Sequence, residues 1–303
     1  MNEAPGISPT WIAVDWGTSN LRVWAMGPEG PLAARDSDAG MSSLVRDAFE
    51  DALLSLIGDW LGDAPMTVIA CGMVGSREGW VEARYATAPA LPQGEPVRAP
   101  VRDVRLSVHV LPGVKQDSPA DVMRGEETQI AGLIATNPRF DGVVCLPGTH
   151  TKWVRVSAGE ICHFRTLMTG ELFALLSGQS VLRHSLRSPG WEAKAFDTAV
   201  EDTLTRPDAL AAELFGIRAR GLVEGMDPPA ARARLSGLLV GAELAATRPY
   251  WLGQDVALIG AAELSHTYAA ALHLVGLSPA LHDATEMTLA GLTAAHTKLK
   301  ETA

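Results

Sequence analysis

Two kinds of apolar pattern alternate along the first third of this chain. Residues 11–36 form three short apolar runs separated by turn residues, which predicts an antiparallel meander of three strands. Residues 46–61 instead place apolar side chains every three or four positions, the spacing of one helix face. A short buried strand is predicted at 66–71, and a glycine-rich loop follows it at 72–80. A meander followed by a helix and a strand is typical of an α/β lobe.

The pattern then becomes irregular before it ends. Residues 86–100 are rich in Pro, Ala and Gly, which predicts chain without regular structure. A strand is predicted at 101–110 and a helix at 121–135, the latter with its apolar side chains on one side. An Asn-Pro pair interrupts the pattern after that helix. We therefore expect the first lobe to span residues 1–138.

The opening meander returns 131 residues further along the chain. Gly17 and Thr18 recur as Gly148 and Thr149, and the two segments align without a gap through all three expected strands. A single Gly-Thr turn is common, but one embedded in a repeated meander indicates two similar lobes. The second lobe is expected to span residues 139–303.

The remainder of the second lobe is mostly helical in pattern. Helices are predicted at 169–177 and 284–298, with two or three more between 195 and 247. Strands are predicted at 255–260 and 271–275. The first of these ends on Gly260 and leads into a helix, and a helix N-terminus at such a junction favours nucleotide binding.

Composition and charge narrow the class of protein. The chain has 303 residues, of which 47% are hydrophobic and 20% charged, and this is normal for a globular protein. Its net charge of −10 disfavours nucleic acid and anionic membranes as partners. Three isolated cysteines indicate free thiols in a reducing compartment. With neither a signal-peptide pattern nor a membrane-spanning apolar run, we expect a cytoplasmic protein.

The first hairpin turn carries groups that suit a nucleotide. Asp15 ends the first strand, and Gly17 lets a ligand approach the backbone closely. Thr18, Ser19 and Asn20 add hydroxyl, amide and backbone N–H donors for phosphate oxygens. A carboxylate at the position of Asp15 is suited to hold a hydrated Mg²⁺ beside those phosphates. The alternative is an ordinary tight hairpin.

The second hairpin differs from the first at one telling position. Leu146 occupies the place of Asp15, so only the first hairpin can supply a carboxylate to a metal. The residues that the second turn offers to phosphate oxygens are Gly148, Thr149, His150 and Lys152. Two such hairpins predict a nucleotide held in a cleft between the lobes, and hence phosphoryl transfer or hydrolysis.

Phosphoryl transfer also needs a base for the acceptor group. Glu126 and Glu127 begin the helix expected after Gly125, where the helix dipole favours a negative charge. A carboxylate that accepts a hydrogen bond from the acceptor hydroxyl can take up its proton as the P–O bond forms. The alternative is a pair of acidic residues that only cap the helix.

A second set of side chains is suited to a polyol or a sugar acid. Arg77 and Glu78 can donate to and accept from hydroxyl groups, although a surface ion pair is the commoner explanation. Trp80 is a candidate wall for a sugar pocket or a core residue. Lys115 and Arg124 are cations available to an acidic substrate.

These motifs resemble the sugar-kinase branch of the actin-like ATPase superfamily. Residues 15–20 resemble its first phosphate motif, residues 146–152 its second, and residues 258–264 its adenosine motif. The resemblance implies that Gly260 lies against the base or ribose. Gly125-Glu126-Glu127 is similar to the segment that begins Gly-Asp in glycerol-kinase-type enzymes and supplies the catalytic base. Glu126 is preferred because it follows the glycine, with Glu127 as the alternative.

More narrowly, nearly the whole chain resembles the 2-dehydro-3-deoxygalactonokinase family. The runs that carry this resemblance are residues 14–22, 71–80, 111–114, 121–129, 146–153 and 164–177. It implies two ribonuclease-H-like α/β lobes and phosphorylation of a 2-keto-3-deoxy sugar acid by MgATP, in galactonate breakdown. The expected partners are ATP and the sugar acid, and a homodimer is one assembly that the sequence allows. Alternatives are a nucleotide-gated binding switch and a phosphohydrolase of the same fold.

Overall fold

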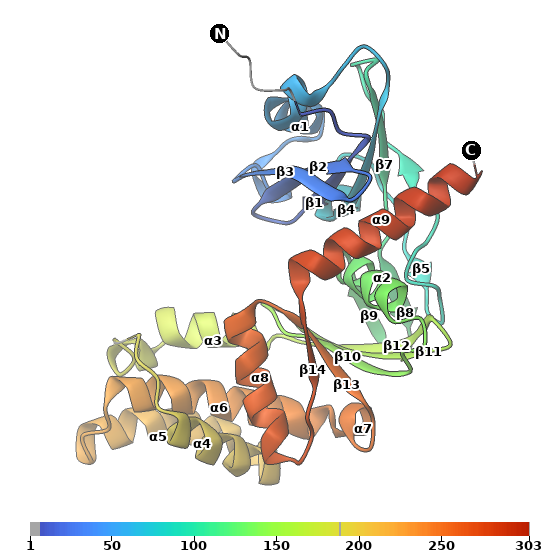
Figure 1. Ribbon diagram of the computed structural model, residues 1–303. Coiled ribbons are helices and arrows are strands. Elements are labelled where there is room, and N and C mark those ends of the chain that lie inside the picture. Colours follow the sequence, from blue (N-terminus) through green and yellow to red (C-terminus); the bar gives the residue numbers. More distant parts are fainter. Residues whose placement is uncertain (1–6, 188, 303) are drawn as a thin grey trace. The chain divides into compact units, whose positions relative to one another are not determined.

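The computed structural model describes residues 7–187 and 189–302, and they form two compact units (Figure 1). Unit 1 takes the chain up to Phe140, together with Ser157–Cys162 and the segment from Ala284 onward. Unit 2 takes Asp141–Val156 and His163–Asp283. The C-terminal helix, which we had placed in the second lobe from the sequence, is therefore part of unit 1.

Unit 1 is built on a six-stranded mixed sheet. Its strands, in spatial order, are β3 (Gly30–Ser37), β2 (Leu21–Gly27), β1 (Trp11–Trp16), β4 (Met66–Gly72), β7 (Leu106–Val110) and β6 (Val97–Arg98). The meander β1–β2–β3 is antiparallel, whereas β1, β4 and β7 run parallel. A smaller sheet combines β5 (Ala86–Thr87), β8 (Val114–Asp117) and β9 (Ala120–Met123). The carboxyl ends of β1 and β4 lie side by side because these strands are parallel neighbours.

Strand β1 is buried on both faces of this sheet. Side chains alternate along a strand, so Val14 and Trp16 point to one face and Trp11 and Ala13 to the other. The first face packs with α1 (Phe49–Ile57), which short 3₁₀ turns extend at both ends. The second face packs with α9 (Ala284–Thr302). This double burial explains the continuous apolar run that precedes Asp15.

Helix α2 (Glu126–Thr136) packs on α9 with unusually close backbones. A Cβ atom on Gly132 would lie 2.0 Å from the carbonyl oxygen of Met287, and one on Gly291 would lie 1.9 Å from that of Thr128. No larger residue fits at either position without a shift of one helix. The crossing of α2 over α9 is therefore fixed by two glycines.

Unit 2 is built on a five-stranded sheet. Its strands, in spatial order, are β12 (Glu160–Leu167), β11 (Thr151–Ser157), β10 (Gly142–Leu146), β13 (Val256–Gly260) and β14 (Ala280–Asp283). As in unit 1, the hairpin β10–β11 is antiparallel and β10 runs parallel to the next strand along, here β13. The repeat in the sequence thus corresponds to a repeat in topology.

Helices make up most of the rest of unit 2. They are α3 (Thr169–Gly178), α4 (Ala193–Thr205), α5 (Leu210–Val223), α6 (Pro228–Ala246), α7 (Arg248–Trp251) and α8 (Ala262–Leu274). Helix α6 packs closely on α4, since Cβ atoms on Gly237 and Gly241 would lie 2.4 Å from backbone oxygens of α4. No helix among the described residues is long and apolar enough to cross a membrane.

Three elements differ from the sequence-based expectation. The helix predicted from residue 121 begins only at Glu126, because the preceding residues form β9 and Gly125 adopts a left-handed φ of 109°. The strand predicted at 101–110 covers only Leu106–Val110. The strand predicted at 271–275 is the end of α8, and the last strand is β14. Short apolar runs fit a buried helix as well as a strand, and Gly276, with a φ of 78°, ends this helix.

Candidate active site

The turn after β1 is held by hydrogen bonds from the segment around residues 40–42. The backbone N–H of Gly17 donates to Asn20 at 2.9 Å, and the carbonyls of Gly17 and Thr18 accept from residues 41 and 42 at 3.0 Å. Gly40 lies so close that a Cβ atom there would be 2.2 Å from Ser19. Thr18, Ser19 and Asn20 are nevertheless exposed. The turn is thus shaped by the protein while its polar groups face solvent.

Asp15, one residue before the end of β1, lies beside a second carboxylate, that of Glu126 on α2. Burial raises the pKa of the Asp15 carboxyl; the guanidinium of Arg22, 3.8 Å away, opposes this shift, and the carboxylate of Glu126 adds to it. The Cys71 thiol donates to Asp15 Oδ1 at 3.9 Å. A Cβ atom on Gly72 would lie 3.5 Å from the same oxygen. The ends of β1 and β4 and the start of α2 therefore bring two acidic groups together.

The two glutamates that begin α2 have different surroundings. Both carboxylate oxygens of Glu127 accept from the Gly125 N–H, at 2.9 and 2.7 Å, and Thr128 Oγ1 donates to it at 3.2 Å. Glu127 is 1% exposed, and burial, with the nearby Glu126 carboxylate, raises its pKa to about 8. Glu126 is half-buried, and its Oε2 accepts from the Arg124 N–H at 3.0 Å. Glu126 is thus the more exposed of the two glutamates.

The residues expected to bind a sugar separate into exposed and buried groups. The Arg77 side chain is 84% exposed and faces Glu82 at 3.9 Å, while Glu78 is also exposed. Trp80 is 5% exposed, donates from Nε1 to the Pro100 carbonyl at 3.0 Å and packs in the core against Trp16. Trp80 therefore supports the 72–79 loop and offers no open ring face.

The two remaining cations also differ. Lys115 on β8 pairs with Asp117 at 2.8 Å. Arg124 lies 4.2 Å from the centre of the Tyr85 ring and donates from Nη2 to the Ala83 carbonyl at 2.9 Å. Its Nε and Nη1 atoms are buried without a hydrogen-bond partner among the described residues. A Cβ atom on Gly75 would lie 2.8 Å from that Nη1. Arg124 thus retains unused donors directly beneath the 72–79 loop.

The turn of the second hairpin is held by the start of α3. The N–H of Glu171 donates to the Thr149 carbonyl at 2.9 Å, and the Glu171 carboxylate bonds His150 Nε2 at 2.6 Å. A Cβ atom on Gly170 would lie 2.3 Å from the Gly148 carbonyl oxygen. Lys152 is 5% exposed. Thr149 is exposed, so this turn too presents polar groups to solvent.

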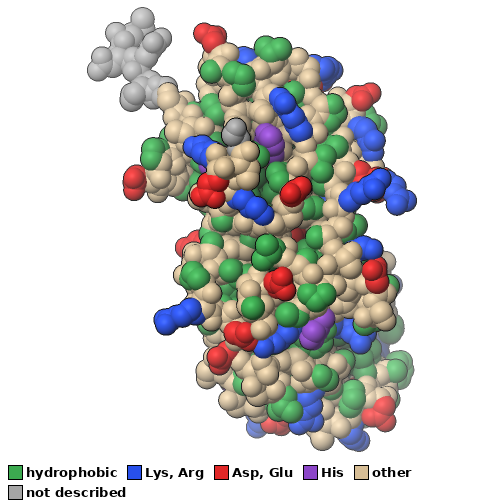
Figure 2. Space-filling view, turned by 90° about the vertical axis from the view of Figure 1, so that its right-hand side faces the viewer, with side chains coloured by type: hydrophobic (Ala, Val, Ile, Leu, Met, Phe, Trp, Pro, Cys, Tyr) green, Lys and Arg blue, Asp and Glu red, His purple; other side chains and the backbone are tan. Residues whose placement is uncertain are grey.

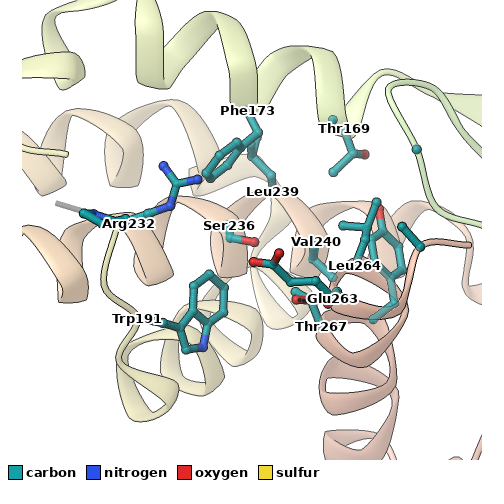
Figure 3. A pocket seen from close by; sticks show the side chains of 15 residues that line it. Thr169, Phe173, Trp191, Arg232, Ser236, Leu239, Val240, Glu263, Leu264 and Thr267 are labelled. Carbon is teal, nitrogen blue, oxygen red and sulfur yellow. Dashed lines mark hydrogen bonds between the residues drawn. The ribbon is translucent and has the colours of Figure 1, made fainter. Parts of the chain in front are cut away.

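A pocket of about 600 Å³ opens beside this turn within unit 2 (Figure 3). Arg232, Phe173 and Trp191 lie at one end of it, and Glu263 points into the middle. The other lining residues are Gly148, Thr169, Gly170, Pro189, Ser236, Leu239, Val240, Ala261, Leu264, Thr267 and Tyr268.

Gly260 ends β13 and directly precedes Ala261, which lines the pocket. A Cβ atom on Gly260 would lie 3.1 Å from Ser265 Oγ. The junction after Gly260 was visible in the sequence, and it leads into Glu263 and Thr267 on α8. Trp191 and Arg232 belong to no motif, and Phe173 lies in the run 164–177 without marking a pocket there. Sequence reasoning therefore missed all three as pocket residues.

Neither a patch of basic side chains nor a cluster of metal ligands is found among the described residues and on the drawn face. On the face that Figure 2 draws, acidic and basic side chains are interspersed and form no basic patch, in keeping with the net charge of −10. Within residues 7–187 and 189–302, no three His, Cys, Asp or Glu side chains cluster as a metal site would require. Any cation held here would therefore take few ligands from the protein.

Two α/β units that each carry a Gly-Thr hairpin turn define the class of fold. In fold alone, the chain resembles the ADPNP-bound activator of 2-hydroxyisocaproyl-CoA dehydratase from Clostridium difficile. The TM-score is 0.53 at 10% identity, over 96% of both chains. The model of the 2-keto-3-deoxy-galactonokinase family matches residues 15–295, and the chain belongs to that family.

Individual relatives agree with this assignment. A probable 2-dehydro-3-deoxygalactonokinase from Rhizobium meliloti is 39% identical, over 94% of this chain and 96% of the relative. The 2-dehydro-3-deoxygalactonokinase of Escherichia coli is 35% identical, over 88% of this chain and 90% of its own length. A crystal structure of a family protein from Sinorhizobium meliloti superimposes with a TM-score of 0.89 at 37% identity. It covers 95% of this chain and 99% of the other.

Proposed function

We propose that this protein transfers the γ-phosphoryl group of ATP to the terminal 6-hydroxyl of 2-dehydro-3-deoxy-D-galactonate. The observation that carries the proposal is the pair of acidic groups, Asp15 and Glu126, in a chain of this family. One acidic group beside the metal and another beside the acceptor hydroxyl are the parts that phosphoryl transfer to an alcohol needs. The kinase family does not favour a nucleotide-gated switch or a hydrolase.

The nucleoside of ATP is assigned to the pocket in unit 2. Trp191 and Phe173 supply aromatic surface for the base, and Glu263 supplies a carboxylate that can accept from ribose hydroxyls. Each Gly-Thr turn, at residues 17–20 of unit 1 and at residues 148–149 of unit 2, is assigned to bind phosphate oxygens. The exposed hydroxyl-bearing residues of these turns, Thr18 and Ser19 in one and Thr149 in the other, support this assignment. His150 is a weaker candidate for a phosphate contact than Thr149, because its Nε2 is already hydrogen-bonded to Glu171.

Glu126 is assigned as the base that orients and deprotonates the acceptor hydroxyl. Glu126 is half-buried, whereas Glu127 is enclosed and its carboxylate is hydrogen-bonded to Gly125. With a pKa of about 8, Glu127 is largely protonated at neutral pH and is a poor proton acceptor there. Its contacts with Gly125 instead fix the peptide that leads into Glu126.

Asp15 is assigned to hold a hydrated Mg²⁺. The fit is supported by the raised pKa of Asp15, since a cation beside this acidic pair would relieve both burial and repulsion. Magnesium commonly keeps several waters and takes one or two carboxylates plus phosphate oxygens, so a single aspartate suffices. When bound, the ion neutralises charge on the β- and γ-phosphates.

The carboxylate of the sugar acid is assigned to Arg124. Of the three candidate cations, Lys115 is paired with Asp117 and the Arg77 side chain is 84% exposed, whereas Arg124 keeps two unused donors. An arginine can bind a carboxylate with two parallel hydrogen bonds. Because these nitrogens are buried, binding requires the 72–79 loop to move. Arg77 and Glu78 on that loop are then available to the sugar hydroxyls.

Paired variants at the start of α2 test this function. We expect Glu126→Gln to lower sugar-acid-dependent ADP release by about 100-fold or more, the usual contribution of a general base. Glu127→Gln should retain far more activity, because the amide replaces a group that is already largely neutral. Glu29→Gln, an exposed change in the turn between β2 and β3 of the same unit, is the control. Equal activity of Glu126→Gln and the parent would refute the assigned base, and ADP release without any sugar acid would refute the kinase.

A further inference from the structure

One buried carboxylate in unit 2 joins the elements that surround the nucleoside pocket. Glu243 on α6 is 2% exposed. Its Oε1 accepts from Trp153 Nε1 at 2.8 Å, and its Oε2 accepts from Tyr268 Oη at 3.0 Å and from the Thr169 hydroxyl. Tyr268 Oη is also 2.9 Å from Thr151 Oγ1. A single side chain therefore links α6 with β11, α3 and α8.

Each partner of Glu243 belongs to a segment with a role in nucleotide binding. Thr151 and Trp153 begin β11, directly after the Gly148–His150 turn. Thr169 begins α3, whose next two residues hold that turn through backbone contacts. Tyr268 lies on α8, and both it and Thr169 line the pocket. The hydrogen bonds of Glu243 thus define where the turn and the pocket wall sit relative to each other.

Folding stability alone gives little reason for a carboxylate at this position. A buried carboxylate is costly to desolvate, and apolar residues of similar volume often serve as well or better. The titratable groups that face Glu243 are the Cys145 thiol on β10 and the Tyr268 hydroxyl on α8. Within the part of the chain that the structure describes, no Lys or Arg is among the groups that shift the Glu243 pKa.

We infer that Glu243 is the positioning residue that sets the second phosphate turn and the nucleoside pocket for ATP. The inference deepens the proposed function and rests on its assignment of the nucleotide to unit 2. The contacts described fit the ionised form, in which Oε1 accepts from the Trp153 N–H and Oε2 accepts from two hydroxyls. Protonation turns one carboxylate oxygen into a donor, so one of these hydroxyls must turn and accept instead, which loosens the turn relative to the pocket.

The charge state of Glu243 makes nucleotide binding depend on pH. Burial raises the pKa of Glu243 to about 7, although its three hydrogen bonds oppose the shift. The carboxylate is therefore ionised above that pH and becomes protonated as pH falls. We expect the affinity for ADP to be highest above pH 7 and to weaken toward pH 6. A glutamine at this position, which does not titrate, should abolish that part of the dependence.

Calorimetric titration with ADP, alongside steady-state kinetics, tests the inference. We expect Glu243→Gln to weaken ADP binding and raise the KM for ATP by about tenfold, the effect of leaving one buried donor unpaired. The kcat at saturating ATP and the KM for the sugar acid should stay within about twofold, since the change affects binding of one substrate. Glu201→Gln, an exposed change on α4, is the matched control.

A second variant keeps the test decisive if Glu243→Gln does not fold. Thr169→Val removes one donor to Glu243 at nearly constant volume and should weaken ADP binding in the same direction. Unchanged ADP affinity and pH dependence in the folded variant would overturn the inference. Equal losses of kcat and of affinity for both substrates would also overturn it. ADP binding is measured without a sugar acid, so failure of the proposed kinase reaction remains distinguishable from failure of this inference.

Discussion

The crossing of α2 over α9 offers a sharp test of how unit 1 positions the assigned base. Gly132 and Gly291 allow the two helix backbones to touch, because Cβ atoms at these positions would lie only 2.0 and 1.9 Å from carbonyl oxygens of the other helix. Ordinary contact of a Cβ atom begins at 3.4 Å. The substitution Gly132→Ala therefore forces the helices apart by more than an ångström or distorts one of them.

Two effects of opposite sign determine the size of the change. Alanine is favoured over glycine inside a helix by about 1 kcal/mol. Overpacking a well-packed interface costs about 1–3 kcal/mol, and occasionally more. Since the atom that blocks the new methyl group is backbone, we expect the clash to exceed the gain, with a net loss of about 2 kcal/mol. Glu126 at the start of α2 should also shift, and misplacement by about 1 Å can lower kcat about 100-fold.

Urea denaturation and steady-state kinetics of Gly132→Ala measure both effects. Gly58→Ala is the matched control, because Gly58 in unit 1 has helical φ and ψ of −56° and −35° and open space around its Cα. We expect this control to be neutral or stabilised by up to about 1 kcal/mol. If Gly132→Ala were as stable and active as Gly58→Ala, the close helix contact and its role in placing Glu126 would be refuted.

Three further expectations concern other parts of unit 1. Asp15→Asn should lower turnover by about 100-fold while the Kd for ADP changes little, and turnover within about tenfold of the parent, or ~1.4 kcal/mol, would contradict the metal assignment. Arg124→Met should raise the KM for the sugar acid about tenfold, as expected for a lost charged contact, and an unchanged KM would exclude Arg124 as the carboxylate anchor. Burial and the charge of Lys300 lower the pKa of His296 to about 4 in the folded protein. An unfolded histidine titrates near ~6.5, so the contribution of neutral His296 to the free energy of unfolding should be fully present above that pH. This contribution should fall by up to about 3 kcal/mol toward pH 4, as the unfolded state binds the proton more tightly. His296→Phe retains stacking on Trp11 and should flatten the dependence of unfolding free energy on pH, measured by denaturation from pH 4 to 7. An unchanged pH dependence would count against the lowered pKa of His296.

The hairpins could be predicted from sequence because their signals are local. Each turn lies between two apolar runs, and the structure forms an antiparallel hairpin at each. Asp15 pairs with Arg22, whereas Leu146, at the place of Asp15, pairs with Lys152, one residue before the position equivalent to Arg22. The α/β class and the family followed from these motifs. In contrast, a five-residue apolar run such as 271–275 does not distinguish a strand from a buried helix, so it was assigned wrongly.

The pocket in unit 2 and the residues that support it depend on contacts between distant segments. Trp191 and Arg232 line the same pocket from separate segments, and neither belongs to a pattern that marks it. Glu243 lies in a mostly apolar helix, where its role becomes visible only once Trp153 and Tyr268 are seen to contact it. The return of α9 to unit 1 depends in the same way on its packing against α2 and β1.

The central claim is that ATP is consumed only as a sugar acid is phosphorylated. Its most direct test measures ADP release and the phosphorylated product together, across a panel of 2-keto-3-deoxy acids and plain aldonates. We expect 2-dehydro-3-deoxy-D-galactonate to stimulate ADP release most strongly, with one phosphate on the 6-hydroxyl of the product for each ADP formed. ADP release that no member of the panel stimulates, or that proceeds with release of inorganic phosphate, would contradict the account.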